Sequence, residues 1–209
     1  MTSTAKKRSL TVPGSGFSPG AKVVVEEVDD QNWKVREPFS YTGARETFSV
    51  PAGTDTDFAS IPRVFVWFLP RYGRYTLAAI LHDYLWRQLA STGAMEYIDA
   101  DGTFRRAMRE LNVPFLKRWI MWAGVRWAAL FKAGGRRGWW REAWRVLLVT
   151  IIALPIVLPP AVVVAAALAV FYLLEAVLWA PLKLADTVKR ALGRPTPKQV
   201  NPPTFEWRL

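Results

Sequence analysis

Cysteine is absent from this chain of 209 residues, and histidine occurs once, at position 82. Without cysteine the chain cannot form a disulfide, a thiolate metal site or a cysteine nucleophile. The first 20 residues have no apolar run after their basic residues, so they do not predict a secretory signal. Residues 1–20 are rich in Ser, Thr, Gly and Pro instead, and we expect a disordered tail there.

Acidic residues are few beside the basic ones, with 17 Asp and Glu against 28 Lys and Arg and a net charge of +11. This balance predicts an anionic partner, either nucleic acid or an anionic lipid surface. The positive charge gathers beside the apolar runs of the last third, and no known nucleic-acid motif occurs. We therefore expect membrane lipid with anionic headgroups as the partner, and no nucleic acid.

Residues 21–135 predict an α+β domain that begins with a small antiparallel β-meander. Three runs rich in valine and aromatic residues are separated by turn residues: Ala21–Val28, Trp33–Tyr41 and Glu46–Val50. Pro38 places the second of them at a sheet edge or ends it early.

Helices follow the strands in this domain. Arg74–Ala90 shows helical periodicity, and His82 lies beside its apolar face with Asp83 about 100° further round. A second helix is predicted from about Tyr97 to Leu111, and Asp101 falls in its first half.

Residues 136–192 predict a basic aromatic collar followed by a membrane segment, and residues 193–209 a disordered tail. The run from Val146 to Leu174 contains no charged residue, and spanning a bilayer takes about 20 apolar residues. Because Pro155, Pro159 and Pro160 oppose one straight helix, we expect a hydrophobic helical hairpin that turns near residues 158–160. The alternative is one span, Ala161–Ala180, preceded by a re-entrant or interfacial helix.

Basic residues flank both ends of this run, so the positive-inside rule favours the hairpin with both termini cytoplasmic. Tryptophan interleaved with arginine is typical of a membrane interface. The predicted interface residues are Trp119, Trp122, Trp139, Trp140, Trp144, Arg136, Arg137, Arg141 and Arg145.

Two sequence blocks carry a family resemblance. FSVPAGTDTDFASIPR (residues 48–63), followed after a short aromatic segment by GRYTLAAILHDYL (residues 73–85), resembles a small family of bacteriophage and prophage proteins, domain of unknown function 1353. The similarity covers roughly Lys22 to Gly135. It implies a phage or prophage origin, and no reaction, because the family has no established activity.

The same blocks concentrate the polar residues that chemistry needs. The motif set is Thr56, Asp57, Ser60, Pro62, Arg63, His82, Asp83 and Asp101. One hypothesis is a divalent metal site on Asp57, His82 and Asp101. A second is catalysis by Ser60 as nucleophile and His82 as base, oriented by Asp57 or Asp101 and with Asp83 nearby.

A third hypothesis, which we favour, is a structural network of buried polar groups, with no cofactor. The nucleotide-hydrolysing HD domains share the His82-Asp83 dipeptide but need further histidines, so they are excluded. The leading expectation is a non-enzymatic protein of the bacterial host inner membrane or of the virion. Its role would lie in lysis, superinfection exclusion, or virion assembly and penetration of the host, with phage structural or host membrane proteins, or further copies, as partners. The alternative is a membrane-anchored hydrolase or metalloenzyme that uses Asp57, Ser60, His82, Asp83 and Asp101.

Overall fold

The computed structural model describes residues 15–43, 46–58, 61–193 and 201–204. They divide into two compact units. The first contains the described residues up to position 58 together with Arg71–Ala153, and the second contains Ile61–Pro70 and the residues from Leu154 onward. The first unit extends beyond position 135, where the sequence analysis ended the α+β domain.

Six short strands form two three-stranded antiparallel sheets in the first unit. One sheet has the order β1-β4-β5, from β1 (Gly16–Phe17), β4 (Phe39–Thr42) and β5 (Thr47–Val50). The other has the order β2-β3-β6, from β2 (Val25–Glu27), β3 (Trp33–Val35) and β6 (Asp55–Thr56).

Pro38 divides the expected strand Trp33–Tyr41 between the two sheets. A proline has no backbone N–H to donate and interrupts a ladder. β3 therefore stops at Val35 and β4 starts at Phe39. The α+β class and the antiparallel pairing are confirmed, with more strands than the sequence predicted.

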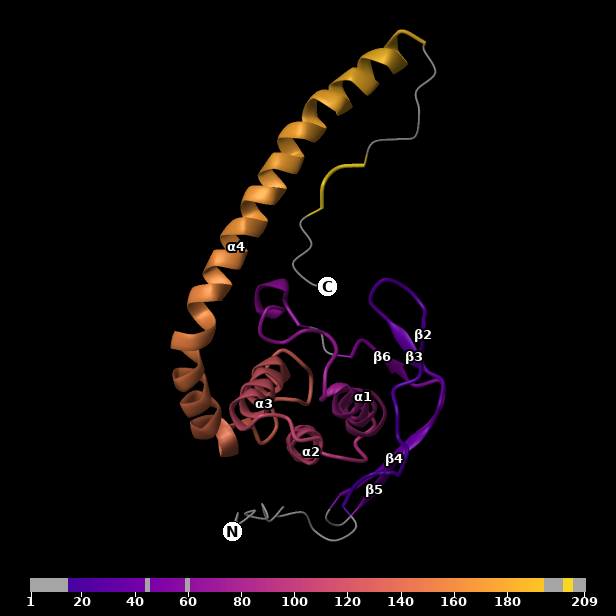
Figure 1. The fold of residues 1–209 in the computed structure, drawn as a ribbon, viewed down its shortest axis with the longest axis vertical. Coiled ribbons are helices and arrows are strands. Elements are labelled where there is room, and N and C mark those ends of the chain that lie inside the picture. The colour runs from indigo at the N-terminus through magenta and orange to yellow at the C-terminus, as the bar shows by residue number, and fades with distance from the viewer. Residues whose placement is uncertain (1–14, 44–45, 59–60, 194–200, 205–209) are drawn as a thin grey trace, which may run out of the picture. The chain divides into compact units, whose positions relative to one another are not determined.

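Three helices pack beside the sheets. They are α1 (Thr76–Tyr84), which continues into the π-helix η2 (Leu85–Ala90), α2 (Tyr97–Glu110) and α3 (Phe115–Ala129). The sheets lie on one side of α1, and α2 and α3 lie on the other (Figure 1). The core between them contains Tyr41, Val50, Ile80, Leu81, Leu85 and Met108. Both helices predicted by periodicity are present within about two residues of the expected bounds.

The long C-terminal helix α4 (Trp139–Ala191) begins inside the first unit. Trp139 and Val146 are buried against Trp122 and Ala123 of α3. The indole Nε1 of Trp127 donates a hydrogen bond to Thr150 Oγ1 at 2.9 Å. The first turns of α4 are thus part of the domain core.

The predicted hairpin is wrong, because α4 runs as one helix through Pro155, Pro159, Pro160 and Pro181. Each proline removes one backbone donor, and apolar helices tolerate this where local adjustments satisfy the freed carbonyls. α4 is, among the described residues, the one helix long and apolar enough to cross a membrane. The remaining short element, η1 (Arg63–Phe65), belongs to the second unit.

Candidate functional site

His82 and Asp83 are neighbours in α1 and serve two different clusters. Successive residues of a helix diverge by about 100°. His82 meets Asp101 of α2, with 2.7 Å between His82 Nε2 and Asp101 Oδ1. Asp83 instead accepts hydrogen bonds from Thr56 and Asp57. We call the first the Asp101 cluster and the second the Asp83 cluster.

In the Asp83 cluster, one carboxylate oxygen holds the loop that follows β6. Asp83 Oδ2 accepts the hydroxyl of Thr56 at 2.5 Å and the backbone N–H of Asp57 at 3.3 Å. Asp57 itself forms an ion pair with Arg87 of η2 at 3.2 Å. The loop turns sharply here, because Phe58 has a φ of 61°, and its N–H bonds back to Thr56 Oγ1 at 3.0 Å. Thr56 Oγ1 and the carboxylate of Asp83 therefore accept the backbone N–H groups of this loop, and the side chain of Asp57 pairs with Arg87.

The charge of Asp83 is poorly accommodated. Burial, reinforced by the neighbouring negative charge of Asp57, raises the pKa of Asp83 to about 7, although the hydrogen bond from Thr56 opposes the shift. Near neutral pH the Asp83 cluster therefore exchanges a proton. A proton on Asp83 would relieve its repulsion with Asp57.

The Asp101 cluster is built around a carboxylate that is completely buried. Asp101 Oδ1 accepts hydrogen bonds from His82 Nε2 and from the indole Nε1 of Trp86, both at 2.7 Å. Asp101 Oδ2 accepts one from Nη1 of Arg126 on α3 at 2.8 Å. The carboxylate thus joins α1, η2, α2 and α3, and it satisfies the rule that a buried charge needs a partner.

Arg126 extends the cluster to α4. Its side chain is fully buried, and its Nε lies 3.8 Å from Oε2 of Glu142. This distance suits an ion pair but is too long for a direct hydrogen bond. Trp139 of α4 donates its indole N–H to the backbone oxygen of Arg126 at 2.8 Å. A chain of contacting polar side chains, His82, Asp101, Arg126 and Glu142, therefore connects α1 to the first turns of α4.

His82 is held in one orientation by this cluster. A carboxylate paired with a guanidinium accepts hydrogen bonds and donates none, so the hydrogen of His82 lies on Nε2. The ring packs on Phe104 at a centroid distance of 4.8 Å, and its side chain is 12% exposed. An imidazole fixed by a buried carboxylate can act as a base through its other nitrogen.

The residues predicted as metal ligands are divided between the clusters. His82 and Asp101 are in contact, while Asp57 pairs with Arg87 beside Asp83. Within the described ranges no group of three or more His, Asp or Glu side chains is placed to hold one ion. Ser60, the predicted nucleophile, lies outside the described residues.

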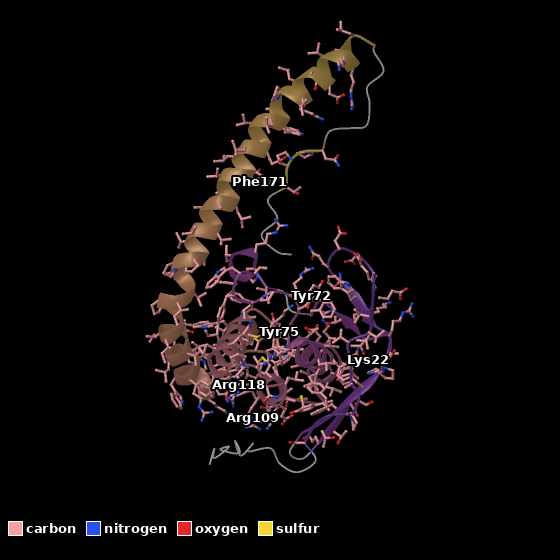
Figure 2. The ribbon with its side chains drawn as sticks, in the orientation of Figure 1. Lys22, Tyr72, Tyr75, Arg109, Arg118 and Phe171 are labelled. Atoms are coloured by element: carbon pink, nitrogen blue, oxygen red, sulfur yellow. The ribbon has the colours of Figure 1, made fainter. Side chains whose placement is uncertain are left out.

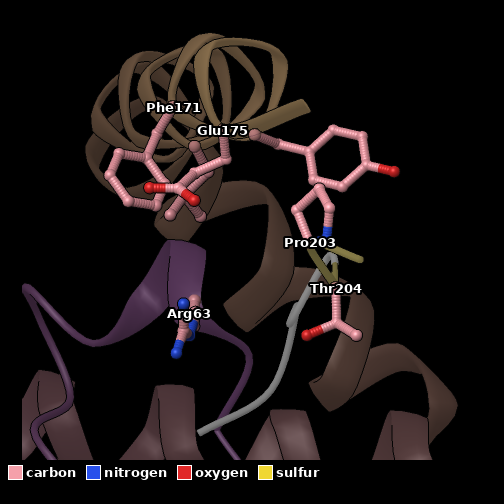
Figure 3. A pocket seen from close by; sticks show the side chains of 7 residues that line it. Arg63, Phe171, Glu175, Pro203 and Thr204 are labelled. Atoms are coloured by element: carbon pink, nitrogen blue, oxygen red, sulfur yellow. The ribbon is translucent and has the colours of Figure 1, made fainter. Parts of the chain in front are cut away.

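Pro62 and Arg63 of the motif lie at η1 in the second unit. A hollow of about 50 Å³ is lined there by Arg63, Phe171, Glu175, Pro203 and Thr204, with Leu168 and Tyr172 (Figure 3). Small-molecule sites occupy roughly 300–1,000 Å³, so this hollow is too small for such a ligand.

The predicted interface residues separate into two groups. Trp122 and Trp139 are buried in the core, so the prediction that they face lipid is wrong. The surrounding tryptophan and arginine composition is typical of an interface, but the turn between α3 and α4 brings these two side chains together in the core. Trp140 and Trp144 are exposed, as are Arg136, Arg137, Arg141 and Arg145, and Trp119 is half-buried.

Sequence reasoning missed Trp86, Arg126 and Glu142. Arg126 stood among apolar residues at a position one helical turn after Trp122, and a charge on an apolar face is a signal for a buried partner. Trp86 follows His82 by four residues, which places it one helical turn further along the chain.

Residues 33–125 match the model of a family described as "Protein of unknown function (DUF1353)". The match includes both carboxylate clusters up to Asp101 and ends one residue before Arg126. No curated protein and no solved structure matches the chain.

Proposed function

We propose that this protein, whose residues 33–125 match a family of unknown function, crosses a membrane once and holds its α+β domain at the bilayer surface. The observation that carries the proposal is the exposed apolar surface of α4 beyond the docked turns. Leu154–Leu174 contains no charged residue and belongs to the second unit.

The length of this segment fits a bilayer. About 21 residues at 1.5 Å per residue give about 31 Å, close to the roughly 30 Å of a hydrocarbon core. Its large side chains are exposed along most of the helix: Leu154, Ile156, Leu158, Val162, Val163, Val170, Phe171, Leu173 and Leu174. Such a continuous apolar surface needs an apolar environment.

The two ends of the segment carry the residues typical of membrane interfaces. Exposed Trp140 and Trp144 precede it, and Trp179 and Lys183 follow it. Indoles favour the headgroup level and cations reach the phosphates. A single crossing places the domain and the residues after Ala191 on opposite sides of the membrane, whereas the expected hairpin would leave both termini in the cytoplasm. Cations flank both ends of the segment, and we assign the domain to the cytoplasmic face of the bacterial inner membrane as the sequence analysis expected.

We assign this membrane-anchored protein a role in a phage or prophage process. The TDFASIPR and HDYL blocks resemble phage proteins, and a phage has uses for an inner-membrane protein in lysis, superinfection exclusion or virion assembly. Thr56, Asp57, His82 and Asp83 of the two blocks form hydrogen bonds or ion pairs with one another or with Arg87 and Asp101, and we take these contacts to favour a non-enzymatic role. Phage or host membrane proteins would be its partners.

Carbonate extraction of the full-length protein tests the anchor. We expect the protein to stay in the membrane pellet, and recovery in the supernatant would overturn the proposal. Single cysteines introduced at Lys34 and Lys189 test the topology, because the chain has no native cysteine. A membrane-impermeant maleimide should label only one of the two in sealed vesicles, whereas labelling of both from one side would indicate a hairpin.

A second candidate function is hydrolysis with His82 as base, which the fixed His82–Asp101 pair favours. Turnover of an ester, phosphoester or peptide by the full-length protein would support it. The turnover should vanish in His82→Gln while the unfolding midpoint stays within a few degrees. Absence of turnover and of bound metal in the unmodified protein would remove this candidate.

A further inference from the structure

A basic surface on α2 and α3 lies near Arg145 of the collar. Arg105, Arg106 and Arg109 occupy adjacent turns of α2, and Arg118 lies in the first turn of α3. Arg106 and Arg109 are exposed, and the other two are half-buried. We call these four residues the basic patch. Arg109 and Arg118 lie close together in Figure 2, and the electrostatic influence of Arg109 on Arg118 agrees with this.

Aromatic side chains hold the half-buried guanidinium groups of the patch. Arg105 Cζ lies 4.1 Å from the ring centroid of Trp119, and Arg118 Cζ lies 5.1 Å from that of Phe115. Phe115 is 66% exposed and the adjacent Leu116 is also exposed. Cations stacked on aromatic rings beside exposed apolar side chains form the chemistry of a lipid headgroup boundary.

The positive charges of the patch are only partly compensated. Burial lowers the pKa of Arg105, and Arg145, Arg106 and Arg118 lower it further against the opposing effect of Glu142. Burial also lowers the pKa of Arg118, with a contribution from Arg109. Arg105 Nε is buried with no hydrogen-bond partner among the described residues.

Two carboxylates adjoin the patch, and both have other partners. Glu110 lies 3.9 Å from Arg109 but is nearly buried next to Tyr41. Glu142 is shared between Arg126 and Arg145. An anion with several acceptor oxygens would relieve the repulsion among the arginines, because arginine forks match phosphate oxygens.

We propose that the basic patch binds the phosphate groups of anionic phospholipids, with Phe115 and Leu116 reaching into the headgroup layer. This rests on the membrane anchoring proposed above. The patch gives the α+β domain a second contact with the bilayer, so that the domain lies on an anionic surface and α4 is not its sole attachment. Phospholipid is favoured over nucleic acid because apolar side chains border the arginines.

The test uses the full-length protein carrying Leu116→Cys, labelled with an environment-sensitive fluorophore and inserted into liposomes. We expect a blue shift when phosphatidylglycerol is added to phosphatidylcholine, and reversal of the shift at high salt. Arg105→Gln, Arg109→Gln and Arg118→Gln together should weaken association of the domain with the phosphatidylglycerol surface by about fivefold for each cation removed, so that the blue shift is lost at the phosphatidylglycerol content that gives half of the change in the parent.

The matched control removes three cations from the sheets, as Lys22→Gln, Lys34→Gln and Arg36→Gln. It should retain the response, and an equal loss in the control would overturn the proposal by showing a net-charge effect. A shift with inorganic phosphate or single-stranded nucleic acid in phosphatidylcholine liposomes would likewise overturn it in favour of those ligands. Flotation of the liposomes reads the anchor separately: protein that floats without a lipid-dependent shift contradicts only the patch.

Discussion

At the scale of the residue, Asp101 determines how the domain is held together. Its carboxylate accepts hydrogen bonds from His82, Trp86 and Arg126, each on a different element. A buried ion pair contributes little compared with a well-packed apolar replacement, but removal of one partner leaves the other charge uncompensated. The cost therefore falls on any substitution that leaves Arg126 buried alone.

Asp101→Asn should lower the free energy of unfolding by about 3–5 kcal/mol, because it removes the charge that faces Arg126. Asp99→Asn, two residues away on an exposed position of α2, is the control and should change it by less than about 0.5 kcal/mol. Denaturant unfolding of the full-length protein in detergent micelles measures both. Equal stability of the two variants would show that the Asp101 cluster is not the centre of the fold.

Asp83 predicts a pH dependence of stability. Its pKa rises from 3.8 in the unfolded chain to about 7 in the folded protein, so the folded state binds the proton more tightly. The free energy of unfolding should therefore fall as pH increases from about 4 to about 7, by about 2–4 kcal/mol, and then level off. Asp83→Asn should remove this part of the slope. Thermal unfolding measures the difference in free energy of unfolding between the two proteins at each pH, and this difference isolates the contribution of Asp83. A constant difference would contradict the prediction.

At the scale of the element, the turn between α3 and α4 makes the docking of α4 possible. Gly135 lies so close to α3 that a Cβ would be 2.5 Å from the carbonyl oxygen of Ala129. The chain can reverse there only with glycine, and the reversal brings Trp139 against Trp122.

Gly135→Ala should destabilise the protein by about 1–3 kcal/mol, because the added methyl group forces the backbone of the turn to move. Gly124→Ala in α3 is the matched control, since a Cβ there meets nothing within 4 Å. The control should leave stability unchanged or increase it by about 0.5–1 kcal/mol, as alanine favours the helix. Thermal unfolding in micelles compares them, and a stable Gly135→Ala would mean that the turn adjusts freely.

The helices were predictable because their apolar periodicity is local. Arg74–Ala90 and Tyr97–Leu111 are found within about two residues of their observed bounds. The course of α4 was not predictable in this way. Proline disfavours helix in water, so the sequence favoured a turn at residues 158–160, whereas α4 continues through them. The pairing of Asp101 with Arg126 depends on how α2 packs on α3, which no local pattern encodes. His82 and Asp83 were correctly placed on one helix, and a contact between His82 and Asp101 was among the alternatives, but the bonding of Asp83 to Thr56 and Asp57 was not foreseen.

At the scale of the whole molecule, the domain does not end where the family match ends. Residues 33–125 match the family, yet the first unit continues through α3 and the turn to Ala153. Val146, Trp139 and Glu142 complete the core from beyond the matched region. The long apolar helix α4 therefore begins within the domain as one continuous element.

A chain truncated after Ala153 should keep a cooperative unfolding transition, whereas one truncated after Arg137 should lose it. The shorter chain lacks Trp139 and Val146, and deletion of one large buried side chain alone costs about 3–5 kcal/mol. Near-ultraviolet circular dichroism and denaturant unfolding in detergent measure the difference. A folded chain ending at Arg137 would show that the domain is complete without α4.

The position of Glu142 has a consequence for synthesis of the protein. Chains fold as they leave the ribosome, and α1, α2 and α3 emerge before α4. Until Trp139 and Glu142 emerge, one face of α3 lacks its packing partner, and the guanidinium of Arg126 is paired with Asp101 but not with Glu142. Completion of the domain therefore coincides with the arrival of the apolar helix, and a chain that stalls before α4 would present an unfinished core to the proteases of the cell.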